Sequence, residues 1–223
     1  MSRPEVSRRI ASIIGDIHRL TQGIAALQSI CITDNPGAYS DFSQQTALLA
    51  EVIALRLRRI VYDTANRSKS DYLLNAADEL DITVSEHDGI VDISLPCLLP
   101  KRSKRAADFI AGPLFATLDD LTSGRQPPFV PFTHCVICIT HIYDKTLPTQ
   151  GRIRDHDNVE LKGIIDTINT FLLTDDAGNL CDIFSTSEVG ETDYTRISIM
   201  EKNRFPTWVL GYENTPKTIS HFQ

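Results

Sequence analysis

The stretch Arg154-Asp155-His156-Asp157-Asn158 decides how the second half of this chain is interpreted, together with Thr174-Asp175-Asp176 about one helix length later. Within residues 159–173, between the two clusters, apolar residues recur with the period of a helix. Asn158 or Asp157 is placed to cap this helix. Carboxylates gathered this closely repel one another, so a fold that collects them needs a compensating charge. Mg²⁺ supplies such a charge because it prefers carboxylate oxygens. The two acidic clusters therefore indicate a site for a divalent cation.

A simpler explanation of the same residues is also open. Acidic side chains before a helix stabilise its dipole by about 0.3–1 kcal/mol each, which accounts for Asp155 or Asp157. The dipole does not favour carboxylates beyond the other end of the helix, but Asp175-Asp176-Ala177-Gly178-Asn179 has the composition of a solvated turn. The spacing alone does not decide between a metal site and these local roles.

The helix between the clusters carries one lysine, Lys162, whose role also has two interpretations. Lys162 and Asp166 lie four positions apart on a polar line beside the apolar stripe, so they can form an exposed pair worth a few tenths of a kcal/mol. The alternative places Lys162 near the metal, facing a scissile phosphate. We slightly favour the exposed pair. His156 alternates away from its neighbouring aspartates and is not expected to be a ligand.

Composition and charge describe an ordinary globular protein. The chain has 223 residues, of which 42% are hydrophobic and 23% charged, enough for a large domain or a catalytic domain with a helical attachment. The net charge of -7 argues against a general nucleic-acid coat protein. Four of the acidic residues belong to the expected cation site, where bound cations would cancel much of the local field. The chain can therefore still act on a polyanion.

The cysteines and the apolar runs indicate where the protein works. Five cysteines are an odd number, and we find no signal peptide, so we expect a reduced, cytoplasmic setting. Cys135 and Cys138 lie three positions apart on an expected buried strand and face opposite sides of it, so we expect no shared zinc ion. No apolar run approaches the ~20 residues of a membrane span. We expect a soluble protein without a membrane partner or a small-molecule cofactor.

The first part of the chain, residues 1–65, is predicted to be a helical hairpin. Asp34-Asn35-Pro36-Gly37 separates a first helix from a second that runs from about Asp41 to Tyr62. Arg56, Arg58 and Arg59 form an expected solvated edge, with contact to a phosphate as the alternative role. Packing on the rest of the chain and dimerisation through the hairpin both remain open. The first helix has the spacing of a coiled-coil seam at Val6, Ile10, Ile13, Ile17, Leu20, Ile24, Leu27 and Cys31.

The second part, residues 66–223, alternates helices and strands. This order predicts an α+β domain with helices over one face of a mixed sheet. The last two strands are expected to be joined by a hairpin-type connection at 188–191. The expected elements are a short helix at 68–80, strands at 82–84 and 90–95, a helix at 106–121, a strand at 134–143, the central helix, and strands at 181–186 and 195–200.

From residue 90 to 200 this arrangement resembles the RusA family of Holliday-junction resolvases. The resemblance rests on Leu95-Pro96, a basic loop, and the frame Arg154-Asp155-x-Asp157-Asn158 followed by Asp175-Asp176. The family consists of small, dimeric, Mg²⁺-dependent endonucleases, often carried by phages and mobile elements. The whole chain is also similar to an uncharacterised group of bacterial mobile-element proteins. DNA recombination and repair are the processes that the resemblance implies.

The resemblance assigns roles to particular residues. Asp155, Asp157 and Asp176 match the metal-binding, catalytic aspartates, with Asp175 beside the last. A lysine usually follows the second aspartate by four residues in the family, but Leu161 holds that place here. Lys162 comes one position later, so either the helix begins differently or the lysine's role is lost. The residues expected to contact DNA phosphates are Lys101, Arg102, Lys104, Arg105, Arg152 and Arg154.

The function implied by the resemblance is therefore Mg²⁺-dependent (or Mn²⁺-dependent) hydrolysis of phosphodiesters in branched DNA by a homodimer. The alternative is a non-catalytic module with a RusA-like fold that binds DNA or a protein partner, which the displaced lysine and the acidic balance favour.

Overall fold

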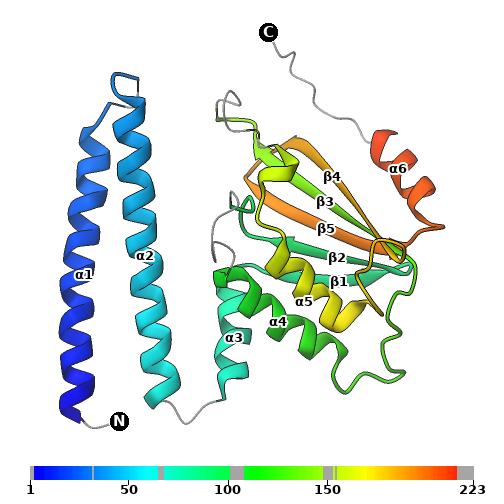
Figure 1. Ribbon diagram of the computed structural model, residues 1–223, viewed down its shortest axis with the longest axis horizontal. Helices are drawn as coiled ribbons and strands as arrows, with labels where there is room; N and C mark the ends of the chain where they lie inside the picture. Colours follow the sequence, from blue (N-terminus) through cyan, green and yellow to red (C-terminus); the bar gives the residue numbers. More distant parts are fainter. Residues whose placement is uncertain are drawn as a thin grey trace. The chain divides into compact units, whose positions relative to one another are not determined.

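A computed structural model describes residues 3–31, 33–64, 68–100, 108–147, 153 and 155–214. The chain forms two compact units, Met1–Lys69 and Ser70–Gln223. The first unit contains two long helices, and the second contains shorter helices with a five-stranded mixed sheet (Figure 1). The fold is α+β, as predicted.

The first unit is a hairpin of α1 (Arg3–Ser29) and α2 (Pro36–Thr64). The second helix begins before the predicted Asp41, because the segment expected only to break the first helix also starts the next one. Pro36 stands at the first helical position, where its missing N–H has no partner to lose, and Asn35 Oδ1 accepts the N–H of Ala38 at 3.2 Å. The turn therefore also supplies the N-cap residue of α2, Asn35.

Few apolar side chains are buried between the two helices. Within residues 3–31 and 33–64, the buried apolar residues are Ile13 and Ile53. The predicted coiled-coil stripe of α1 divides into two rows, with Ile13 turned toward α2 and a second row left in solvent. That second row consists of Ile10, Ile17 and Ile24, which are 44%, 44% and 55% exposed.

The sheet of the second unit has the strand order β1-β2-β5-β3-β4. An antiparallel hairpin at one edge turns through Asp88 and Gly89, whose φ angles of 48° and 67° suit a tight two-residue turn. The strands are β1 (Thr83–His87), β2 (Ile90–Leu95), β3 (Cys135–Asp144), β4 (Cys181–Gly190) and β5 (Tyr194–Glu201).

The strand β3 lies between β4 and β5, so the predicted hairpin between the last two strands is wrong. β3 pairs in parallel with β4 and antiparallel with β5. A parallel neighbour requires a crossover, and α5 (Lys162–Leu172) provides it. The alternation within β4 and β5 indicates strands but does not identify their partners. Every residue of β3 from Cys135 to Tyr143 is buried.

Helices lie on both faces of the sheet, which corrects the expectation of a single covered face. The helices α4 (Asp108–Thr122) and α5 pack on one face, and Ala77 of α3 (Lys69–Glu79) joins the same core. On the other face, α6 (Phe205–Asn214) packs Phe205 and Trp208 against Cys138. Cys135 belongs to the first core and Cys138 to the second, so the two thiols face opposite sides of β3, as predicted.

None of the helices in the described part of the chain combines the length and the apolar character that crossing a membrane requires.

Candidate functional site

The first acidic cluster lies in a short segment between β3 and α5. Asp155 precedes a single 3-10 turn, His156–Asn158, and α5 begins only at Lys162. The residue before α5, Leu161, makes no side-chain capping bond, so the expected cap by Asn158 or Asp157 is wrong. The reason is that the chain is extended at the buried Val159, and the N–H of Glu160 donates to the carbonyl of Pro100 at 2.9 Å.

The second acidic cluster lies in the turn that leads from α5 to β4. Asp175 Oδ1 accepts the N–H of Ala177 at 3.1 Å, the local bond that Asp makes in solvated turns. Leu173 forms a parallel bridge with Phe132 just before this turn. Asp175 and Asp176 are both exposed. Asp175 thus has a local structural role, the one proposed by the simpler interpretation.

The two clusters lie beyond opposite ends of α5, which is drawn in yellow in Figure 1. At a rise of about 1.5 Å per residue, the 11 residues of this helix span roughly 16 Å. Within the described ranges, no three His, Cys, Asp or Glu side chains are grouped so that they could hold a metal ion. The metal site at Asp155, Asp157 and Asp176 remains a prediction, and we derive no catalytic step through a metal.

Lys162 forms the exposed pair that the sequence favoured. Its Nζ lies 2.7 Å from Asp166 Oδ2, and 81% of the lysine side chain is exposed. The hydrogen bond with Asp166 raises the pKa of Lys162, and the charges of Asp176 and Glu160 add smaller contributions in the same direction. Lys162 is thus a positively charged residue at the surface, and Asp176 of the second acidic cluster contributes to its raised pKa.

The residues predicted to contact DNA cannot be placed against these clusters. Lys101, Arg102, Lys104, Arg105, Arg152 and Arg154 all lie outside the described residues. Their role as phosphate contacts remains a prediction.

A polar cluster that the sequence did not reveal lies on the α6 face of the sheet. The carboxylate of Asp92 accepts a hydrogen bond from Ser198 and lies 3.4 Å from His87 Nε2. Asp92 was recognisable only as a polar position in an alternating strand, because its partners come from the neighbouring strands. The hydroxyl donates to the carboxylate rather than to the imidazole, so these three residues do not have the serine–histidine contact of a catalytic triad.

The hairpin exposes apolar side chains along both of its helices. On α1 these are the row Ile10, Ile17 and Ile24, with Ile14 at 61% exposure beside it. We call these four residues the α1 isoleucine row. On α2 the exposed apolar residues include Leu48, Val52, Leu55, Leu57 and Tyr62. Two helices that leave this much apolar surface in water are typical of a protein–protein contact surface.

Comparison with known families identifies the chain over nearly its full length. A protein family described as "Family of unknown function (DUF6100)" matches residues 2–223. The chain belongs to DUF6100. No curated protein matches it. Because the match includes the hairpin and the α+β unit, both are parts of the DUF6100 sequence pattern. The description names no activity, so the resemblance to RusA remains a prediction.

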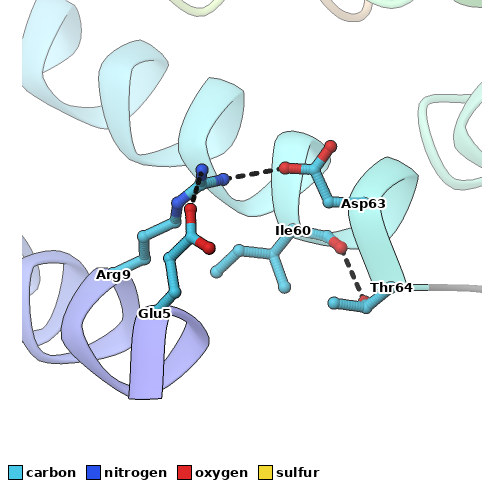
Figure 2. Close-up of polar contacts among 5 residues, drawn as sticks. All are labelled: Glu5, Arg9, Ile60, Asp63 and Thr64. Carbon is cyan, nitrogen blue, oxygen red and sulfur yellow. Dashed lines mark hydrogen bonds and ion pairs between the residues drawn. The ribbon is translucent and has the colours of Figure 1, made fainter. Parts of the chain in front are cut away.

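The DUF6100 hairpin also contains a cluster of arginines around a cavity of about 290 Å³. Its lining residues are Arg9, Ser12, Ile13, Arg56 and Arg59. Arg9 donates to Glu5 on its own helix at 3.0 Å and to Asp63 on α2 at 2.7 Å (Figure 2). The sequence indicated the α2 arginines as a solvated edge. It did not indicate the cavity, because Arg9 and Ser12 come from the other helix, more than forty positions away.

Proposed function

We propose that this chain is a non-catalytic assembly module, in which two copies associate through the α1 isoleucine row. The observation that carries the proposal is the exposure of Ile10, Ile17 and Ile24, spaced seven residues apart on one side of α1. The α+β unit is then the part of each subunit that is available to bind DNA or another protein.

Physical considerations favour a second copy as the occupant of this row. Full burial of an isoleucine side chain is worth about 1.5–3 kcal/mol, so covering four of them supplies a substantial driving force. In the heptad of α1, the exposed isoleucines occupy one seam position, and Ile13, Leu20 and Leu27 occupy the other. Because Ile13 is turned toward α2, the exposed position remains available for a second copy. A two-fold axis would place the same row of both copies in contact.

The test is the oligomeric state of the full chain by sedimentation velocity over a range of concentrations. The variant Ile10→Lys/Ile17→Lys is expected to be monomeric where the parent is dimeric, because each lysine places a charge in the contact. The matched control, Leu48→Lys/Val52→Lys, changes exposed apolar residues of α2 and is expected to remain dimeric. A parent that is monomeric at every concentration, or a dimer that the α1 variant leaves intact, would exclude this assembly.

A second candidate is the Mg²⁺-dependent endonuclease acting on branched DNA. It is supported by the resemblance to RusA in the frame Arg154-Asp155-x-Asp157-Asn158 followed by Asp175-Asp176. A cytoplasmic setting suits either function, and the five free cysteines are consistent with it.

Nicking of a labelled four-way junction, with Mg²⁺ or Mn²⁺, separates the two candidates. Cleavage by the parent that Asp157→Asn abolishes supports the nuclease. Junction binding in EDTA, without cleavage in either metal, supports the binding module. Asp120→Asn is the matched control, since Asp120 is an exposed aspartate on α4 outside both acidic clusters and outside the Lys162–Asp166 pair.

A further inference from the structure

We propose that the cavity between α1 and α2 is a binding site for a small phosphate oxyanion, such as inorganic phosphate or pyrophosphate. Guanidinium groups from both helices line it, and Ser12 adds a hydroxyl donor. Guanidinium forks match the oxygen geometry of phosphate and make charge-assisted hydrogen bonds with it. The site is separate from both acidic clusters and from the α1 isoleucine row.

The ion pairs around the cavity leave one of its arginines available. Arg9 is held by Glu5 and Asp63, and Arg56 is held by the buried carboxylate of Asp16. Within the described ranges, Arg59 lines the cavity and makes no ion pair or hydrogen bond. The fixed arginines therefore shape the site, and Arg59 is the cation that an incoming anion would neutralise.

The size and the surroundings of the cavity favour a small, free anion over a polyanion. Its volume of about 290 Å³ is at the lower end of the range for ligand pockets. The carboxylates of Glu5 and Asp63 lie beside Arg9, as Figure 2 shows. These carboxylates would repel the neighbouring phosphates of a nucleic acid drawn across the hairpin. A phosphate or pyrophosphate brings fewer negative charges toward these carboxylates than a nucleic acid strand does.

The cavity and the α1 isoleucine row share no residue, although Ile13, which lines the cavity, lies only about 40° around the helix from Ile17. Failure of one measurement would not decide the other, since each has its own variant, Arg59→Ala for the cavity and Ile10→Lys/Ile17→Lys for the row.

Calorimetric titration of the full chain with sodium pyrophosphate tests the site. Saturable binding is expected, and Arg59→Ala is expected to weaken it at least about tenfold, the loss of one hydrogen-bonded charge contact. Arg58→Ala removes the same charge from the adjacent position, outside the cavity lining, and is expected to change affinity less than about twofold. Circular dichroism confirms that both variants keep the parent helix content.

Three results would overturn the assignment. The first is no binding of pyrophosphate at millimolar concentration. The second is equal weakening by Arg58→Ala and Arg59→Ala, which would indicate general charge attraction. The third comes from a parallel titration with duplex DNA: binding of the duplex that depends on Arg59, without binding of pyrophosphate, would assign the cavity to a nucleic acid backbone.

Discussion

Arg56 of α2 donates a hydrogen bond to the carboxylate of Asp16 on α1. Asp16 is only 2% exposed. Arg19 donates to the other oxygen of the same carboxylate. A buried carboxylate is costly unless it is paired. Arg19 lies on the same helix as Asp16, so the contact that depends on how the two helices meet is the one with Arg56. Asp16 therefore helps to fix how α1 and α2 pair.

The first prediction concerns Arg56. Arg56→Ala leaves Asp16 with one of its two partners and is expected to lower the free energy of unfolding by about 1–3 kcal/mol. Urea unfolding followed by circular dichroism measures the change. Arg58→Ala is the control, since Arg58 makes no ion pair with any described residue, and its effect is expected within about 0.5 kcal/mol. Equal effects of the two substitutions would show that the Asp16 contact contributes nothing specific.

The second prediction compares two glycines of α1. A methyl group at Gly15 meets no atom within 4 Å, so Gly15→Ala is expected to stabilise the helix by about 0.5–1 kcal/mol. A methyl group at Gly23 would lie 2.8 Å from Thr46 Oγ1 on α2, so Gly23→Ala is expected to lose this gain or to destabilise the hairpin. Thermal melts of both variants measure the difference.

A double variant tests the cause of the difference. Gly23→Ala combined with Thr46→Ala removes the opposing side chain and is expected to recover stability relative to Gly23→Ala alone. If the double variant is no more stable, contact between the helices at Thr46 is not the reason.

The third prediction is the order in which the thiols react. Cys31 is exposed, and its hydrogen bond with Thr33 lowers its pKa, whereas burial raises the pKa of Cys135 and Cys138 to about 12. Iodoacetamide near neutral pH is expected to modify Cys31 in the folded protein and to reach the two buried thiols only after denaturation. Peptide mass spectrometry identifies the modified sites, and Cys31→Ser is expected to remove the rapid reaction. Early modification of Cys138 would contradict the burial of β3.

The same buried thiols predict a loss of stability at high pH. In the folded state their pKa lies above the ordinary value of 9.0, so between about pH 9 and 12 the folded protein binds more protons than the unfolded chain. Stability is therefore expected to fall as the pH rises through this range, with a slope of up to about 1.4 kcal/mol per pH unit for each thiol. Cys138→Val should remove the contribution of one thiol from the slope of the free energy of unfolding against pH. Urea unfolding at a series of pH values measures this slope. An unchanged slope would exclude Cys138 as a source.

The last prediction tests whether Lys162 has more than a local role. Its pair with Asp166 is exposed, so Lys162→Ala is expected to change the free energy of unfolding by less than about 0.5 kcal/mol. Under the nuclease candidate, the same substitution would abolish junction cleavage without affecting the fold. A large loss of stability would instead show that the helix depends on this pair.

Local patterns in the sequence were sufficient to find most of the secondary structure. The alternation of 90–95 and the Asp88-Gly89 pair match β2 and its turn, and the helical period of 159–173 contains α5. These signals are local because propensity, periodicity and turn residues act over a few positions. The short α6 was not predicted, because it presents only a few apolar residues, among them Phe205 and Trp208, without an extended stripe.

Long-range relationships were not predictable in the same way. Nothing in the composition of β4 and β5 indicates that β3 separates them. Arg9 likewise meets Asp63 only because the hairpin folds back on itself. Each of these depends on tertiary packing, which a single sequence does not encode in any short window.

The position of β5 has a consequence for how the second unit is completed. Among the strands in the described part of the chain it is the last to be synthesised, yet it enters the interior of the sheet and bonds to β2 on one side and β3 on the other. Until Tyr194–Glu201 arrives, the earlier strands can form only two separate ribbons, β1 with β2 and β3 with β4. Two-stranded ribbons are marginal in water, so a nascent chain that stops short of this strand exposes two open edges at once.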